Sequence, residues 1–140
     1  IGEDLILMNQ PNDFPLDRHI LSFCLLGVEK SRLEEAEHLI SSESLGSVAY
    51  YRDRLFGEYS LMVQPPNTSK WIGVELWCEH YGVSPARIVA VGDAGNDFEL
   101  LTGADFSVAI EDSEQFLLDV ADATIPPPSK GGWAQILDYL

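Results

Sequence analysis

The sequence is poor in positive charge. Its 140 residues include 8 lysines and arginines against 23 aspartates and glutamates, which gives a formal net charge of −15. Proteins that bind the phosphate backbone of a nucleic acid need patches of Lys and Arg, so we expect no nucleic-acid partner. An anionic substrate would be repelled unless a metal ion or a well-placed lysine offset the charge locally.

Long apolar runs and cysteines are also scarce. No stretch approaches the roughly 20 apolar residues that a membrane helix needs, and no basic-then-apolar leader follows Ile1, so we expect neither a membrane partner nor a secretory signal. Cys24 and Cys78 lie far apart in apolar contexts, which predicts buried free thiols rather than a disulfide or a metal site. This pattern fits a reducing cytoplasm. The sequence contains no P-loop, no GxGxxG and no Ser/His/Asp arrangement.

The first 64 residues combine strand patterns with one helix pattern. Ser31 is expected to cap a helix that runs to about Ser44, because apolar residues follow it at helical spacing. Three segments rich in β-branched, aromatic or aliphatic residues predict strands: 21–27, 47–52 and 58–64. We therefore interpret residues 1–64 as an α+β segment, which ends at the break Pro65-Pro66-Asn67.

From residue 68 onwards, helix and strand patterns alternate. Thr68 or Ser69 can cap a helix over about 70–81, and Gly82 can end it. Strands are predicted at 87–91, 106–110 and 123–125, and helices at about 97–102, 113–121 and 132–140. This alternation indicates an α/β fold with a doubly wound parallel sheet of the Rossmann type.

The stretch IVAVGDAGNDFELL, residues 88–101, carries the most informative polar residues. Its apolar strand ends on Asp93, at the carboxyl end where open α/β sheets bind ligands. Gly95 can take a positive φ in the turn without cost, Asn96 is expected to cap the next helix, and Asp97 to lie in that helix's first turn. Two carboxylates this close suit an anion site if a cation such as Mg²⁺ lies between them. Ordinary strand-to-helix turn chemistry explains the same residues, so both interpretations stay open at this point.

The segment VGDAGNDFELL resembles the fourth motif of the haloacid dehalogenase-like phosphatases, in the Gly-Asp-x-x-Asn-Asp form of the Cof-type and sugar-phosphate phosphatases. NTSKWIGVELWCEHYGV is similar to the third motif, in which a lysine starts a helix. SKGGWAQIL resembles the closing helix of the mannosyl-phosphoglycerate and sucrose-phosphate phosphatase branch. The resemblance implies that 65–140 form the C-terminal half of the phosphatase core and that 1–64 form part of its α+β cap domain.

The resemblance also implies roles for four residues. Asp93 would be a Mg²⁺ ligand, Lys70 would bind the phosphate and offset charge during catalysis, and Asn96 would contact the substrate phosphate. Asp97 would lie next to the metal or the lysine and would support one of them without contacting the substrate itself. Lys70 starts a helix, where the helix dipole favours anions, although taken alone it would be interpreted as a surface lysine.

Two features depart from the family pattern. The usual Gly-Asn-Ala after the strand at 106–110 is replaced by Glu111-Asp112-Ser113, and we assign no role to these two acids. The family's Asp-x-Asp-x-(Thr/Val) motif, which supplies the nucleophile and the general acid/base, does not occur in the sequence. The nearest segments, GED, NDFPLD and YRDRL, have the wrong spacing.

We therefore expect the C-terminal half of a cytoplasmic, Mg²⁺-dependent phosphatase that acts on a small phosphorylated metabolite, such as a sugar or sugar-acid phosphate, and that is inactive without its upstream aspartates. The alternatives are a non-catalytic binding or regulatory module and a phosphosugar mutase. Loss of the first core strand would leave the strand at 88–91 with an open edge, so we expect this edge to be covered by the missing N-terminal half or by self-association.

Overall fold

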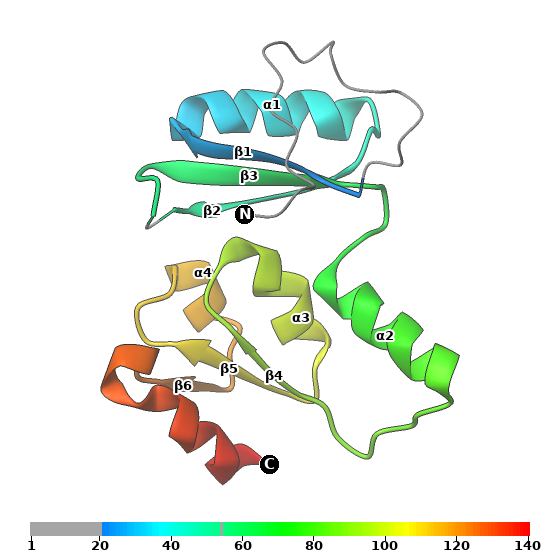
Figure 1. Cartoon of the computed structure of the whole chain (residues 1–140), viewed down its shortest axis with the longest axis vertical. Coiled ribbons are helices and arrows are strands. Elements are labelled where there is room, and N and C mark those ends of the chain that lie inside the picture. The colour runs from blue at the N-terminus through cyan, green and yellow to red at the C-terminus, as the bar shows by residue number, and fades with distance from the viewer. Residues whose placement is uncertain (1–20, 54) are drawn as a thin grey trace, which may run out of the picture.

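The computed structural model describes residues 21–53 and 55–140, which form two units, each built on a three-stranded sheet (Figure 1). The N-terminal unit, residues 21–64, contains β1 (Phe23–Val28), α1 (Lys30–Ser42), β2 (Ser47–Arg52) and β3 (Tyr59–Gln64). Its strands are antiparallel in the order β1-β3-β2. Helix α1 covers one face of this sheet, with Leu33 of α1 and Leu61 of β3 fully buried.

The predicted N-cap of α1 is wrong by two residues. The helix begins at Lys30 and its N-cap residue is Glu29, whose side chain makes no capping hydrogen bond. Ser31 therefore lies inside the first turn. The three strand predictions of this unit agree with the structure to within two residues at each end.

The C-terminal unit, residues 68–140, alternates helices with strands. Its helices and strands are α2 (Lys70–Tyr81), β4 (Val89–Gly92), the 3-10 turn η2 (Gly95–Asp97), α3 (Phe98–Gly103), β5 (Phe106–Ile110), α4 (Gln115–Leu118), β6 (Ala123–Ile125), and the 3-10 segments η3 (Pro128–Lys130) and η4 (Gly132–Tyr139). The strands are parallel in the order β4-β5-β6. The predicted α/β fold with a parallel sheet is confirmed. Among the described residues, β4 is an edge strand.

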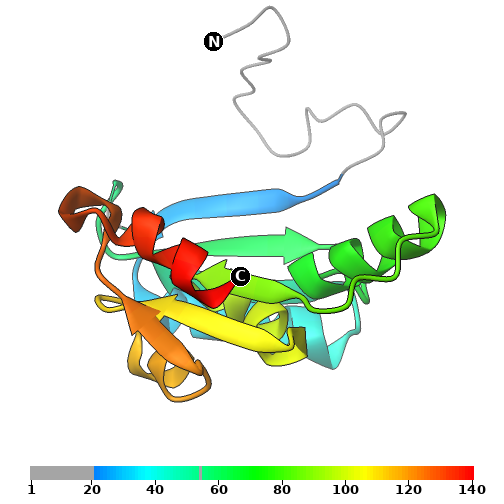
Figure 2. The same cartoon turned by 90° about the horizontal axis from the view of Figure 1, so that it is seen from below.

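Apolar side chains cover both faces of this parallel sheet, and Figure 2 shows the C-terminal helical segment (red) on one side of its strands and the helices α3 and α4 (yellow to orange) on the other. On one face, Ala90 packs with Leu101 of α3 and Leu117 of α4. On the other, Val108, Ile110 and Ile125 form a cluster that Ile136 and Tyr139 of η4 cover. Successive residues of a strand point to opposite faces, so the apolar strand β4 serves both clusters, through Ala90 on one face and through Val89 and Val91 on the other. The result is a sheet held between helical layers, with the carboxyl ends of its strands facing the N-terminal unit.

Local signals place the helix α2 correctly. The hydroxyl of Ser69 accepts a hydrogen bond from the amide of Ile72 at 3.2 Å, and Gly82 ends the helix with a left-handed φ of 63°. The helix predicted over 113–121 is corrected, whereas the terminal helix predicted over 132–140 is present. The segment 113–121 contains only α4, because the chain turns early for Asp122 to accept hydrogen bonds from the amide and hydroxyl of Ser107. The segment 132–140 is a 3-10 helix rather than an α-helix.

The two cysteines are free, as expected, but they are not buried. Cys24 is exposed on β1 and Cys78 is partly exposed on α2. Helix α2 buries none of its residues fully. The apolar neighbours of Cys78 in the sequence therefore do not place this cysteine in the core. No helix in the described ranges 21–53 and 55–140 is long and apolar enough to cross a membrane.

Candidate active site

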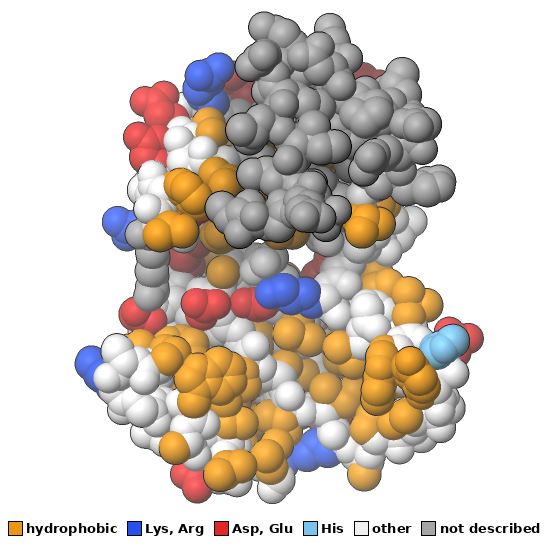
Figure 3. All heavy atoms as spheres, in the orientation of Figure 1, with side chains coloured by type: hydrophobic (Ala, Val, Ile, Leu, Met, Phe, Trp, Pro, Cys, Tyr) orange, Lys and Arg blue, Asp and Glu red, His pale blue; other side chains and the backbone are white. Residues whose placement is uncertain are grey.

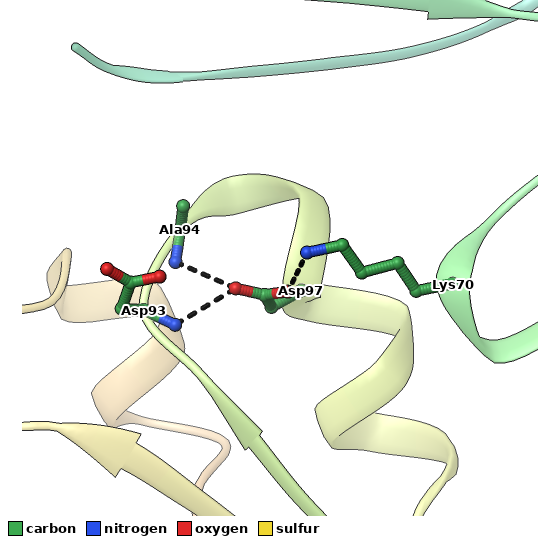
Figure 4. Close-up of polar contacts among 4 residues, drawn as sticks. All are labelled: Lys70, Asp93, Ala94 and Asp97. Carbon is green, nitrogen blue, oxygen red and sulfur yellow. Dashed lines mark hydrogen bonds and ion pairs between the residues drawn. The ribbon is translucent and has the colours of Figure 1, made fainter.

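Asp97 organises the turn that follows β4 (Figure 4). Its side chain is buried, and one carboxylate oxygen accepts the backbone amides of Asp93 and Ala94 at 2.9 and 3.1 Å. A Cβ atom on Gly92 would lie 2.5 Å from the Cβ of Asp97, so a glycine at this position lets the aspartate fold back over the strand end. The turn is thus built around a carboxylate that caps its own loop.

Lys70 reaches the same carboxylate from a different element. It is the first residue of α2, and its ammonium group forms an ion pair with the second oxygen of Asp97. The lysine side chain is about half exposed, at 47%, while the Asp97 side chain is 7% exposed. The charge of Lys70 is therefore held at a fixed point beside the loop but remains accessible from the cavity above it.

Asp93 lies on the opposite side of Asp97 from Lys70 (Figure 4). Its backbone amide is tied to Asp97, but its carboxylate makes no hydrogen bond or ion pair with the residues that the structure describes. An exposed carboxylate at the carboxyl end of a parallel strand is a hard oxygen donor available to a cation.

The predicted role of Asn96 as a helix cap, between these two aspartates, needs correction. Asn96 does not cap α3, because it lies within η2, and Asp97 accepts the amides of the turn instead. Gly95 has no positive φ, so its backbone conformation does not require a glycine. Asn96 instead contributes to the wall of the cavity described next.

A cavity of about 890 Å³ lies between the two units and is lined by all four residues singled out in the sequence. The C-terminal unit contributes Lys70, Asp93, Ala94, Asn96, Asp97, Asp112, Ser113 and Glu114, and the N-terminal unit contributes Tyr51, Arg52, Asp53, Leu55, Gly57 and Glu58. Figure 3 shows acidic and basic side chains side by side along the hollow between the units. The structure therefore gathers the predicted site residues around one space, roofed by the end of β2 and the turn after it.

Among the lining residues that the sequence did not single out, two charged ones from the N-terminal unit, Arg52 and Asp53, bear most on the site. Arg52, the last residue of β2, lines the cavity and makes no ion pair with described residues. Asp53 accepts hydrogen bonds from the Ser60 hydroxyl and from the amides of Phe56 and Leu55. The Ser60 hydroxyl, followed by the Phe56 amide, lowers the pKa of Asp53 below its usual value of 3.8. No local pattern marks either residue, because their role depends on where β2 ends over the other unit.

The loop after β5 completes the wall. The amide of Glu111 donates to the carbonyl of Ile125 at 2.9 Å, and Asp112 lines the cavity. The hydroxyl oxygen of Ser113 is buried and has no hydrogen-bond partner among the residues that the structure describes. A buried hydroxyl without a partner is unusual in a folded protein, so this oxygen is a free hydrogen-bonding group in the wall of the cavity.

The donor set fits one direct carboxylate contact to a metal ion. Both oxygens of Asp97 are engaged, by Lys70 and by two amides, which leaves Asp93 as the free donor of the pair. No group of three or more His, Cys, Asp or Glu side chains in the described ranges could hold a metal ion together. Mg²⁺ often retains several waters and binds through one or two carboxylates plus phosphate oxygens, and the residues present fit that limited role.

The sequence matches a known protein family over most of its length. The family is described as haloacid dehalogenase-like hydrolase, and the match covers residues 8–137. Over 62 residues the chain is 44% identical to the chloroplastic endoribonuclease YBEY of Arabidopsis thaliana, covering 44% of this chain and 11% of that protein. Over 82 residues it is 26% identical to phosphoglycolate phosphatase of Archaeoglobus fulgidus, covering 59% of this chain and 37% of that enzyme.

Solved structures share the fold at low sequence identity. A haloacid dehalogenase-like hydrolase from B. subtilis superposes with a TM-score of 0.74 at 20% identity, covering 95% of this chain and 46% of that one. A sugar phosphatase of HAD subclass IIB superposes with a TM-score of 0.59 at 20% identity, covering 76% and 39%. The chain thus spans less than half the length of each of these proteins.

Proposed function

Because the chain belongs to the haloacid dehalogenase-like hydrolase family, we propose that it is the C-terminal part of a Mg²⁺-dependent phosphatase that hydrolyses a small phosphorylated metabolite. The observation that carries this proposal is the grouping of Lys70, Asp97 and Asp93 beneath one cavity. Relatives named phosphoglycolate phosphatase support the reaction class. In this proposal residues 1–64 belong to the cap and residues 65–140 to the core.

Each of the site residues has a distinct task in this proposal. Asp93 would hold the Mg²⁺, and the bound ion would supply positive charge at the phosphoryl group. The ammonium of Lys70 binds the same phosphoryl group, and Asp97 fixes its position through their ion pair. Asn96 donates a hydrogen bond to the phosphate from the cavity wall.

The nucleophile has to come from outside these residues. The family's reaction uses an aspartate that attacks phosphorus and a second that acts as general acid/base, and the sequence contains no Asp-x-Asp-x-(Thr/Val) motif. Since the matched proteins are more than twice as long as the matched part, we propose that these aspartates lie in an upstream segment and that the chain alone is inactive. The free state of both cysteines accords with a cytoplasmic location for the protein.

Arg52 offers a place for a second anionic group of the substrate in a cavity wall that is otherwise largely acidic. The described wall of the cavity holds two cations, Lys70 and Arg52, and only Lys70 is paired. The guanidinium fork of arginine matches a carboxylate with two parallel hydrogen bonds. Arg52 is thus suited to bind a carboxylate on the leaving group. The sequence led us to expect either a sugar phosphate or a sugar-acid phosphate. A carboxylate site favours the sugar-acid phosphate.

The test is a panel of phosphomonoesters given to the full-length gene product with Mg²⁺ and with EDTA. We expect Mg²⁺-dependent release of inorganic phosphate, fastest from substrates with a carboxylate, and no release by residues 1–140 alone. Tight binding of phosphorylated compounds without hydrolysis would instead identify a binding module. Migration of phosphate within one sugar, without release, would identify a mutase.

A further inference from the structure

The N-terminal unit closely approaches the turn after β4, here called the catalytic loop, at Gly95. A Cβ atom on Gly95 would lie 2.4 Å from the backbone oxygen of Tyr50 in β2, and 3.7 Å from the ring of Phe116. Since Gly95 has no positive φ, its conformation is open to other residues. The position requires a glycine because the backbone oxygen of Tyr50 approaches it from the N-terminal unit.

The atom that approaches Gly95 cannot give way by itself. Tyr50 lies in the middle of β2, which pairs with β3 from Ser47 to Arg52 without a break in register. Ordinary van der Waals contact of a Cβ begins at about 3.4 Å, so a methyl group on residue 95 would require a displacement of about 1 Å. A flexible side chain could turn away, but a backbone carbonyl of a strand that is hydrogen-bonded along its length to β3 moves only with that strand. The added methyl group would therefore lift the whole N-terminal unit.

The contact also divides the space between the units. The part of β2 before it, residues 47–50, lines a cavity of about 490 Å³ together with Phe98 and Phe116. The part after it, Tyr51 and Arg52, lines the cavity that contains Asp93. Strand β2 thus contacts Gly95 between the two cavities. The separation of β2 from Gly95 at this contact sets the distance between Arg52 and Asp93.

We propose that Gly95 is a positioning residue that seats β2 on the catalytic loop and thereby brings Tyr51 and Arg52 within reach of the substrate. The inference rests on the proposed function for its catalytic consequence, but the seating itself is a property of this chain. A larger residue at position 95 moves β2 away from the C-terminal unit. Substrates large enough to contact Tyr51 and Arg52 then lose those contacts. A very small phosphoester does not reach these residues and is unaffected.

The two native cysteines allow the seating to be measured without any activity. Cys24 lies in the N-terminal unit and Cys78 in the C-terminal unit, so spin labels on both report the distance between the units by pulsed electron resonance. We expect the distance distribution to shift or broaden progressively in Gly95→Ala, Gly95→Val and Gly95→Leu. The matched control is Gly73→Ala, because a Cβ on Gly73 meets nothing within 4 Å, and its distribution should equal that of the unsubstituted chain.

Two results would overturn the proposal. One is an unchanged distribution in all three Gly95 variants. The other is loss of slow hydrogen exchange at β5 amides in Gly95→Ala, since the methyl group would then act inside the C-terminal unit and not between the units. In the full-length product, Gly95→Ala should lower kcat/KM for the best substrate of the panel at least tenfold more than for acetyl phosphate. An equal loss for both would contradict a role in positioning while leaving the phosphatase function intact.

Discussion

Lys70 and Asp97 are 27 positions apart in the sequence and form an ion pair that joins the start of α2 to the turn after β4. The pair links two segments that each resemble ordinary turn or cap chemistry when read alone. One oxygen of Asp97 holds the lysine while the other holds two backbone amides of the turn. The geometry of the candidate site therefore depends on this one buried carboxylate.

Replacing Asp97 tests how much of the turn depends on that carboxylate. Asp97→Ala should lower the free energy of unfolding by about 1–3 kcal/mol, because two amides lose their acceptor in a partly buried setting. The measurement is urea denaturation of residues 1–140. Asp138→Ala, at an exposed aspartate, is the control and should change stability by less than about 0.5 kcal/mol. Equal effects in the two variants would show that the turn does not need Asp97.

Replacing Lys70 separates a catalytic role from a surface role. In the full-length product, Lys70→Ala should lower kcat by orders of magnitude, because a fixed charge at the phosphoryl group is lost. Lys30→Ala is a matched control, since Lys30 also pairs with a carboxylate and its side chain is 49% exposed, close to the 47% of Lys70. The control should keep its kcat. A Lys70→Ala enzyme with unchanged kcat and a lower melting temperature would identify a stabilising surface pair only.

Asp53 makes the stability of the N-terminal unit depend on pH in acid. Hydrogen bonds from Ser60 and Phe56 lower the pKa of Asp53, so the folded state favours the charged carboxylate. A group with a depressed folded pKa contributes stability above its unfolded pKa, and this contribution is lost as the pH falls from about 3.8 through the lower folded value. Asp53→Asn should therefore flatten the fall in melting temperature below pH 4, measured by circular dichroism. Parallel curves for the two proteins would contradict this account of Asp53.

The open edge of β4 predicts association of residues 1–140. Among the described residues, β4 pairs on one side only, and Leu76, Trp77 and Tyr81 of the neighbouring α2 are more than half exposed. Unpaired strand edges recruit other strands, and we propose that an upstream segment of the full-length product or a second copy covers this one. Light scattering with intact-mass measurement should show residues 1–140 to be associated. A strictly monomeric, well-ordered species would contradict the proposal.

The parts of the structure that the sequence predicted well are those with local causes. Helix α2 has its own start and stop signals in Ser69 and Gly82, and β5 is a buried apolar run between turns. The errors have distant causes. The reason for a glycine at 95 is the carbonyl of Tyr50 in the other unit, and Arg52 lines the site only because β2 crosses above it. The spacing of residues along the chain predicts neither the contact between Gly95 and Tyr50 nor the position of Arg52 at the site.

The dependence of phosphate release on Asp93 and Mg²⁺ tests the central claim most directly. Phosphate release from the best substrate of the panel should rise with Mg²⁺ and saturate in the full-length product, and it should be absent at every Mg²⁺ concentration in Asp93→Asn, while circular dichroism shows the same fold. The free carboxylate of Asp93 beside the Lys70–Asp97 pair leads to this expectation. Phosphate release by Asp93→Asn with the Mg²⁺ dependence of the unsubstituted enzyme would contradict the account.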